Sequence, residues 1–191
     1  MNITVQVNNI FNTEYKEYSY PGLDITCTKV CEMNRIPKNK RVTWSQCLLW
    51  ALEQVETEVI LYLQEDYFFK DYVKTEVIQD LFGIFPIDPS VMCIHLTDQA
   101  SRAEKKSEYE NLDYVKVFQK DRVSCQAAFW RKEELRSIIK FYESGWEFEE
   151  FGSMRSSLIG ARYLVVNERY VKKNSFEIIP YVFTGIVQGK W

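Results

Sequence analysis

The sequence predicts an α/β fold in which helices cover a mixed β-sheet. Residues 58–63 and 91–96 form two short apolar runs, which are typical of strands buried on both faces in the middle of a sheet. Strand patterns of this kind alternate along the chain with segments whose apolar residues have helical spacing. With 191 residues the chain has the length of one domain, so we expect residues 1–191 to form a single unit.

The composition is that of a folded protein and excludes several function classes. Hydrophobic residues make up 46% of the chain, and 12 Tyr, 12 Phe and 5 Trp argue against disorder as the main state. The net charge is −3 and the longest basic run is residues 38–41, so we expect no nucleic-acid partner. No stretch approaches the roughly 18 apolar residues of a transmembrane segment, and the N-terminus lacks a signal-peptide pattern, so we expect a cytoplasmic protein.

In the first half of the chain, the clearest helix follows Thr43. Thr43 is a favourable N-cap and Gln46 stands three residues later, which is the pattern of a capping box. Apolar residues then recur at helical spacing to about residue 56, and a second such pattern extends from Val73 to Phe82. Strands are expected at 2–7, 24–30, 58–63 and 91–96.

In the C-terminal part of the chain, eight of the 16 residues in the segment 98–113 are charged, and its apolar residues show no sustained periodicity. We therefore expect a long mobile loop there. His95 lies inside an apolar strand pattern, which is typical of a satisfied, partly buried histidine rather than a catalytic one. Strands are expected at 114–118, 125–130, 162–167 and 177–186, and helices at 132–142 and from Trp146 onward.

Two adjacent acids, Glu65 and Asp66, follow Gln64 at the end of the apolar strand 58–63. In open α/β sheets, ligands bind beyond the carboxyl ends of the strands. Adjacent acids at such a place are costly unless they are solvated, paired or bound to a metal. Mg²⁺ and Mn²⁺ prefer carboxylate oxygens and often bridge to phosphate. The pattern therefore fits both a solvent-exposed transition from the strand to a loop and a binding site for a nucleotide diphosphate.

A second group of acids lies in the segment 146–150, which reads Trp-Glu-Phe-Glu-Glu. Desolvation beside a Trp and a Phe raises the pKa of a carboxyl group. A carboxylate with a raised pKa suits a general base acting on a hydroxyl group. The same acids also fit an ordinary helix start, where they complement the helix dipole.

Several stretches of the chain, in their order, resemble bacterial glycosyltransferases of the GT-A fold, most of all small sugar transferases of polysaccharide and lipopolysaccharide clusters. The stretches are VTWSQCLLWALEQV, VILYLQEDYF, SCQAAFWRKEEL and GWEFE, and the resemblance covers about residues 42–156. It implies a three-layer GT-A-like fold with a mixed, mostly parallel sheet. Residues 1–30 lack a convincing helix between two strand patterns and no helix pattern follows the last strand, so we expect a form of this fold shortened at both ends.

In the GT-A family, an apolar strand ends in a D-x-D-type motif that holds a divalent metal and the nucleotide-sugar diphosphate. At this place the chain has Gln64, Glu65 and Asp66, so the resemblance implies that Asp66 and Glu65 bind Mg²⁺ or Mn²⁺ and that all three contact the donor. The first position of the motif is Gln instead of an acid, which makes the motif incomplete.

The family's W-x-x-E-[DE]-type motif supplies the catalytic base. Glu149 has the matching spacing from Trp146, so the resemblance implies Glu149 as the base, with Glu147 as second choice. Gln126, Trp146 and Arg155 are the further candidates for substrate binding. The implied reaction is inverting transfer from a nucleotide sugar to a carbohydrate or glycolipid acceptor.

Two other functions remain open at the level of sequence. One is a non-catalytic carbohydrate- or protein-binding relative that has lost donor binding. It is favoured by Gln64, which makes the acidic motif incomplete, and by residues 1–30, which lack a convincing helix pattern. A metal-dependent nuclease also groups carboxylates, but the chain lacks the basic surface that such an enzyme needs.

Overall fold

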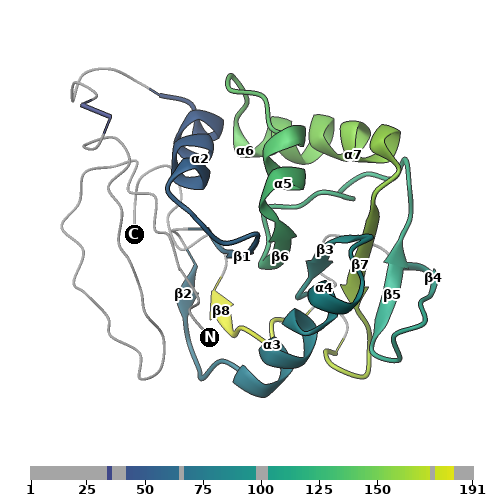
Figure 1. Cartoon of the computed structure of the whole chain (residues 1–191). Helices are drawn as coiled ribbons and strands as arrows, with labels where there is room; N and C mark the ends of the chain where they lie inside the picture. Colours follow the sequence, from purple (N-terminus) through teal and green to yellow (C-terminus); the bar gives the residue numbers. More distant parts are fainter. Residues whose placement is uncertain (1–33, 36–41, 65–66, 98–102, 173–174, 183–191) are drawn as a thin grey trace.

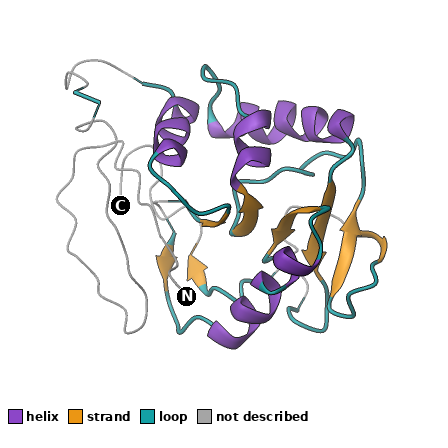
Figure 2. Ribbon diagram, viewed as in Figure 1, coloured by secondary structure: helices purple, strands orange, loops and turns teal. Residues whose placement is uncertain are grey.

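The computed structural model shows a three-layer α/β architecture, with helices on both faces of a central sheet (Figure 1 and Figure 2). It describes residues 34–35, 42–64, 67–97, 103–172 and 175–182. The strands expected at 2–7 and 24–30, as well as Glu65 and Asp66, lie outside the described residues.

The central sheet has the strand order β1-β6-β3-β7-β5-β4, and a second sheet pairs β2 with β8. The strands are β1 (Val59–Tyr62), β2 (Phe68–Phe69), β3 (Val91–His95), β4 (Ala103–Lys106), β5 (Leu112–Val115), β6 (Ala128–Arg131), β7 (Arg162–Val166) and β8 (Tyr181–Val182). The helices are α2 (Trp44–Glu53), α3 (Thr75–Phe82), α4 (Ile84–Ile87), α5 (Lys132–Ile138), α6 (Gly145–Glu147), the π-helical turn η1 (Phe148–Gly152) and α7 (Ser153–Ile159).

The central sheet is mixed, as the sequence predicts. Among the described strands, however, β3 and β7 are the parallel pair, and every other pairing of this sheet is antiparallel. The expectation of a mostly parallel sheet is therefore wrong for these strands. Two placements give this result: β6 lies between β1 and β3 and runs antiparallel to both, and β5 runs antiparallel to both β7 and β4. An apolar run reveals burial on both faces but not the direction of the strand.

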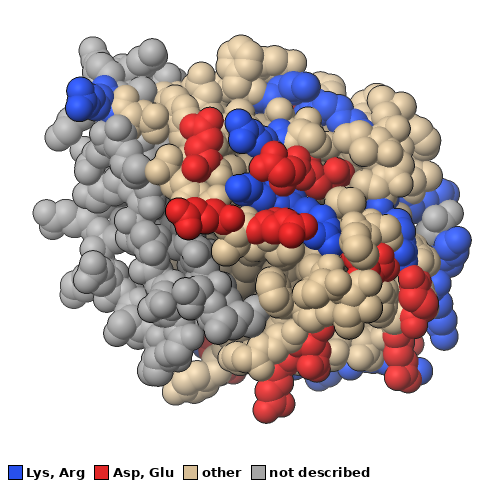
Figure 3. Space-filling model, in the orientation of Figure 1, with Lys and Arg blue, Asp and Glu red and all other residues tan. Residues whose placement is uncertain are grey.

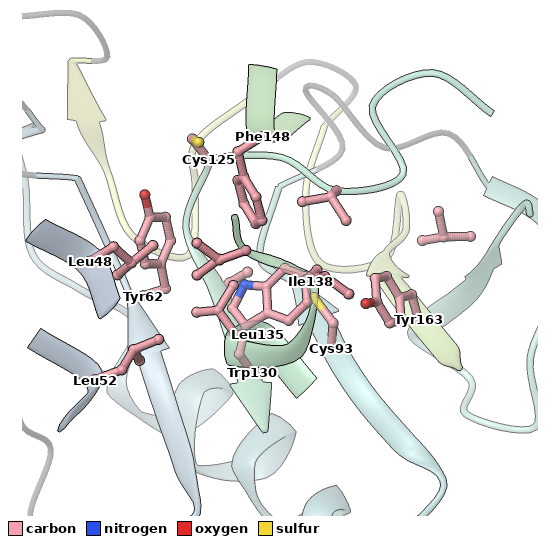
Figure 4. Close-up of a cluster of buried hydrophobic side chains, with 14 of the residues drawn as sticks. Leu48, Leu52, Tyr62, Cys93, Cys125, Trp130, Leu135, Ile138, Phe148 and Tyr163 are labelled. Atoms are coloured by element: carbon pink, nitrogen blue, oxygen red, sulfur yellow. The ribbon is translucent and has the colours of Figure 1, made fainter. Parts of the chain in front are cut away.

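Two hydrophobic cores lie on the two faces of the sheet, because successive residues of a strand point to opposite faces. On β6, Trp130 contributes to the core under α2 and α5, whereas Phe129 contributes to the core under α3 and α4. Figure 4 shows the first core, in which Leu48 and Leu52 of α2 approach Trp130 from one side.

The helix α2 begins as the sequence predicts. The backbone N–H of Gln46 donates to the Thr43 hydroxyl at 3.1 Å, and the N–H of Thr43 donates to the Gln46 side chain at 3.1 Å. This reciprocal pair confirms the predicted capping box.

The charged segment 98–113 differs from its prediction as a long loop. Residues 98–102 lie outside the described part, but β4 and β5 form an antiparallel pair within the segment. Leu112 and Val115 are buried, and Leu112 pairs with Val166 of β7. The charges of this segment are compatible with strands because a sheet edge tolerates exposed charged side chains.

Other boundaries differ by a few residues from those expected. The strand predicted at 114–118 begins and ends earlier, as β5, and the helix predicted at 132–142 ends at Ile138. Within the described part of the segment 177–186, only Tyr181 and Val182 form a strand.

The surface of the described residues carries charges of both signs. In the view of Figure 3, Lys and Arg side chains interleave with Asp and Glu side chains. None of the helices that the described residues form combines the length and apolar character needed to cross a bilayer.

Candidate active site around Glu149

The candidate site lies where the chain enters β6. Ala128, the first residue of β6, pairs with Tyr62 at the end of β1 and with His95 at the end of β3. The residues that precede Ala128 therefore lie beyond the carboxyl ends of β1 and β3. This is the region of an α/β sheet where ligands bind.

Two stacked tyrosines hold this segment from one side. The rings of Tyr67 and Tyr181 are parallel within 9°, with centroids 4.2 Å apart. The Tyr67 hydroxyl donates to the carbonyl oxygen of Cys125 at 2.7 Å, and the Tyr181 hydroxyl donates to Oε1 of Gln126 at 2.9 Å. The same Tyr181 oxygen accepts from the N–H of Ala127 at 3.3 Å. The backbone before β6 is thus fixed by residues from two distant parts of the chain.

A carboxylate holds the same segment from the other side. The backbone N–H of Cys125 donates to Oε1 of Glu149 at 2.7 Å. Burial raises the pKa of the half-buried Glu149 above its ordinary value, although the hydrogen bond from Cys125 acts in the opposite direction. Among the described residues, none donates a hydrogen bond to the second carboxylate oxygen. Glu149 therefore has one oxygen fixed by the backbone, and no described donor engages the other.

Glu149 belongs to the π-helical turn η1, which orients its carboxylate toward the backbone N–H of Cys125. Phe148 is buried and points into the core beside Cys125, where its ring lies 5.2 Å from that of Trp44 (Figure 4). The Ser153 hydroxyl donates to the Glu149 carbonyl at 2.5 Å and accepts from the N–H of Val123 at 2.9 Å. Single π-helical turns inside helices are frequent at functional sites.

Cys125 contacts the residue that follows the first acidic motif in the sequence and a residue of the second motif. Its carbonyl accepts from Tyr67, which directly follows Asp66, and its N–H donates to Glu149. Because both contacts involve one residue, the Tyr67 hydroxyl lies within about 9 Å of the Glu149 carboxylate. Gln64 also belongs to this region, since its carbonyl accepts from the N–H of Tyr67 at 3.3 Å.

Glu147 has a different environment from Glu149. Its carboxylate accepts from the backbone N–H and the hydroxyl of Ser144, both at 2.8 Å, and the Glu147 N–H donates to the Ser144 hydroxyl. These hydrogen bonds, first of all that from the Ser144 backbone, lower the pKa of the exposed Glu147. The carboxylate of the second-choice base is thus engaged in a helix cap.

Arg155 is also engaged inside the protein. Its guanidinium makes two bonds to the buried Glu143 carboxylate, at 2.8 and 2.6 Å, and its Nε donates to the carbonyl of Ile138 at 2.7 Å. This internal ion pair uses the donors that we expected to contact the substrate. Trp146, by contrast, is almost fully exposed.

His95 is buried, and its Nε2 lies 3.0 Å from the carbonyl oxygen of Arg122. Burial lowers the pKa of His95 to about 4, so the ring is neutral near pH 7. His95 has a hydrogen-bond partner, as predicted, but it is fully rather than partly buried.

Cys125 and Tyr181 are the residues of this site that sequence reasoning missed. They offered no local signal, because their roles depend on contacts between distant parts of the chain. Within the described ranges, no group of three or more metal-ligating side chains occurs.

Comparison with known proteins gives no family for this chain. No family model matches, and no curated protein matches. The solved structures that are similar include apo UDP-glucose pyrophosphorylase, with a TM-score of 0.41 and 8% identity over 76% of this chain and 55% of that chain. They also include the bifunctional IspDF from Campylobacter jejuni, with a TM-score of 0.38 and 14% identity over 94% of this chain and 52% of that chain. The chain thus spans about half the length of these two structures, and the similarity concerns the path of the chain and assigns no substrate.

Proposed function

We propose that this protein is a glycosyltransferase that moves a sugar from a nucleotide-sugar donor to a hydroxyl group of a carbohydrate or glycolipid acceptor. The observation that carries the proposal is the double contact of Cys125, with Tyr67 beside the acidic motif and with Glu149. This contact supports the proposal because Tyr67, which follows the acidic motif in the sequence, and Glu149 of the second motif both meet the segment beyond the carboxyl ends of β1 and β3.

In this proposal Glu149 is the general base. Its second carboxylate oxygen takes the proton of the acceptor hydroxyl while the acceptor oxygen forms a bond to the anomeric carbon. The bond between that carbon and the donor diphosphate breaks, and the nucleoside diphosphate leaves with the bonding electrons. Attack opposite to the leaving group inverts the configuration. The raised pKa of Glu149 supports this role, because a base is most effective when its pKa approaches the working pH.

Glu65 and Asp66 are proposed to hold the donor diphosphate through Mg²⁺ or Mn²⁺. Their carboxylates are the hard oxygen ligands that these cations prefer. When bound, such a cation offsets the negative charge of the leaving diphosphate. Gln64 and Gln126 are proposed to contact the substrates through their amide groups, and the exposed indole of Trp146 is proposed to stack on a sugar ring.

Donor binding is tested by calorimetry with a panel of nucleoside diphosphates, with and without Mn²⁺. We expect saturable binding of at least one nucleotide, strengthened by the metal, and loss of that metal effect in Asp66→Asn. Asn is nearly isosteric with Asp but is a weaker ligand for hard cations. If no nucleotide binds and carbohydrate binding is retained, the chain is instead a non-catalytic carbohydrate-binding relative.

The base is tested with the pair Glu149→Gln and Glu147→Gln, by the nucleoside diphosphate released from nucleotide sugars in the presence of simple glycoside acceptors. Glu149→Gln is expected to lower turnover by roughly 10²–10⁴-fold and to leave nucleotide affinity unchanged. Glu147→Gln is the matched control, because Gln retains the cap with Ser144. A loss of turnover in Glu147→Gln instead would move the base to Glu147.

A further inference from the structure

The side-chain amide of Gln126 is held in one orientation by the hydroxyl group of Tyr181. Gln126 is half-buried, and its Oε1 accepts from this hydroxyl at 2.9 Å. The same hydroxyl oxygen accepts from the backbone N–H of Ala127 at 3.3 Å. If the amide were reversed, Nε2 would face the hydroxyl oxygen, and the hydroxyl proton would lose Oε1 as its acceptor. The two contacts therefore determine which end of the amide faces Tyr181.

Tyr181 is itself held firmly in place. Its backbone pairs with that of Phe69 in the small sheet of β2 and β8 (Figure 1). Its buried ring is stacked on Tyr67, and the ring of Phe176 lies 4.5 Å away between centroids. A buried ring with aromatic neighbours has little freedom to move its hydroxyl group. The Tyr181 hydroxyl is therefore a fixed point from which the Gln126 amide is oriented.

The other end of the amide consists of hydrogen-bond donors. Because Oε1 faces Tyr181, the Nε2 group with its two N–H donors lies on the other side of the amide. No described residue accepts a hydrogen bond from Nε2, whereas the backbone N–H of Gln126 donates to the Ser124 hydroxyl at 3.0 Å. A group that presents only donors binds oxygen atoms with free lone pairs and does not bind an ammonium group.

We propose that Tyr181 is a positioning residue that directs the Nε2 donors of Gln126 toward an oxygen of the nucleotide-sugar diphosphate. This inference rests on the proposed function. Tyr67, on which Tyr181 stacks, directly follows in the sequence the acidic motif that we propose to hold this diphosphate. A hydrogen bond from an amide to a charged phosphate oxygen is stronger than one to a neutral group.

The proposed contact has a consequence for the geometry of the reaction. Gln126 directly follows Cys125, whose backbone N–H holds Oε1 of Glu149 at 2.7 Å. One short backbone segment then carries both the contact to the base and the contact to the leaving diphosphate. A displacement in which the base and the leaving group act on opposite sides of one carbon depends on such a fixed separation.

The positioning role is tested by calorimetry of the full chain with the tightest-binding nucleoside diphosphate of the panel and Mn²⁺. We expect Gln126→Ala to weaken binding about tenfold, because a hydrogen bond to a charged group is lost. Tyr181→Phe retains the ring and removes the hydroxyl. It should weaken binding about threefold or more, without exceeding Gln126→Ala, because the released amide is oriented correctly for only part of the time.

The double variant Tyr181→Phe/Gln126→Ala separates positioning from a general effect on the structure. It should bind as Gln126→Ala does, because Tyr181 acts through Gln126. Two losses that multiply in the double variant would overturn the positioning role. A Gln126→Ala variant that weakens the binding of nucleotide sugars but not of the nucleoside diphosphate would exclude the contact with the diphosphate.

Tyr109→Phe is the matched control. It also removes a tyrosine hydroxyl that makes a tertiary hydrogen bond, at 3.0 Å to Asp88, but at the opposite end of the central sheet. It should leave nucleotide affinity unchanged. A loss equal to that of Tyr181→Phe would show that the effect is not specific to the candidate site.

NMR of the free protein tests the orientation of the amide without a ligand. The side-chain amide signals of Gln126, identified by their absence in Gln126→Ala, should differ from those of an unrestrained Gln and approach them in Tyr181→Phe. Unrestrained signals in the wild type would overturn the positioning role, also where Tyr181→Phe does not fold. If the wild type binds no nucleoside diphosphate, the proposed function fails and the diphosphate contact with it, while the NMR result still decides the role of Tyr181.

Discussion

Acidic side chains have opposite environments at the two ends of the central sheet. At one end, before the first residues of β3 and β7, Asp88 and Glu108 both pair with the guanidinium of Arg162. At the other end, beyond the carboxyl ends of β1 and β3, Glu149 is half-buried, and one of its oxygens accepts from a backbone N–H. We call these regions the ion-pair end and the Glu149 end.

At the ion-pair end both acids are matched by donors. Asp88 accepts from the Ser90 hydroxyl at 2.6 Å, from Tyr109 at 3.0 Å and from Arg162 at 2.8 Å. These partners, first of all Ser90, lower the pKa of Asp88 to about 2. At the Glu149 end, burial dominates and the pKa is raised. An acid stabilised as an anion contributes to folding, whereas an acid that is desolvated is costly to the fold and available for proton transfer.

Removing the cation of the ion-pair end gives the largest expected effect on stability. Arg162→Ala leaves Asp88 and Glu108 close together without their shared partner, and we expect a loss of about 2 kcal/mol in the free energy of unfolding. The control is Arg169→Ala, because the pair of Arg169 with Glu110 is solvent-exposed and contributes less than about 0.5 kcal/mol. Urea titration of both variants measures the difference, and equal losses would contradict the structural role of Arg162.

A smaller effect is expected in the acid dependence of stability. Because its folded-state pKa is lowered, Asp88 stabilises the fold above the ordinary carboxyl range, and this contribution is lost as the pH falls toward about 2. After allowance for screening by solvent, the contribution is about 1 kcal/mol. Asp88→Asn should therefore be less stable than the wild type at pH 7 and should lose less stability between pH 5 and 2, as followed by thermal unfolding.

The smallest effect on stability, and the one of opposite sign, is expected at the Glu149 end. A carboxyl group with a raised folded-state pKa stabilises the fold below its unfolded pKa, and this contribution disappears as the pH rises through the folded value. At pH 7 we therefore expect Glu149→Gln to match the wild type or to exceed it by less than about 1 kcal/mol. A clear destabilisation of Glu149→Gln at pH 7 would assign the residue to the fold.

Sequence reasoning was most successful where a feature depends on neighbouring residues. The capping box of Thr43 and Gln46 and the buried central strand β3 follow from local patterns, and both are confirmed. The strand β1 lies where it was expected, but the prediction that it is buried in the middle of the sheet is wrong, because β1 is at the edge of the described sheet and three of its four residues are only partly buried. A second capping box, Ser144 with Glu147, has the S-x-x-E spacing and is therefore also predictable from neighbouring residues, although our expectations did not include it. That spacing alone favours Glu149 over Glu147 as the base, because a carboxylate engaged in a cap is less available to a substrate.

Features that depend on tertiary contacts were not predictable from the sequence. The direction of β6 follows from its two neighbours and not from its apolar residues. The meeting of Tyr67, Cys125 and Glu149 joins three elements that are far apart in the chain. Local patterns contain no information on such distances.

The stacking of Tyr67 on Tyr181 also has a consequence for the order in which the protein is made. On the ribosome, the chain emerges from its N-terminus at about 5–20 residues per second, and structure forms as segments become available. All described strands of the central sheet precede Tyr181 in the sequence, so they can pair before Tyr181 emerges. Tyr181 then supplies the ring that packs on Tyr67 and the hydroxyl that holds Gln126 and Ala127. The candidate site is therefore completed only after all described strands of the central sheet have been made.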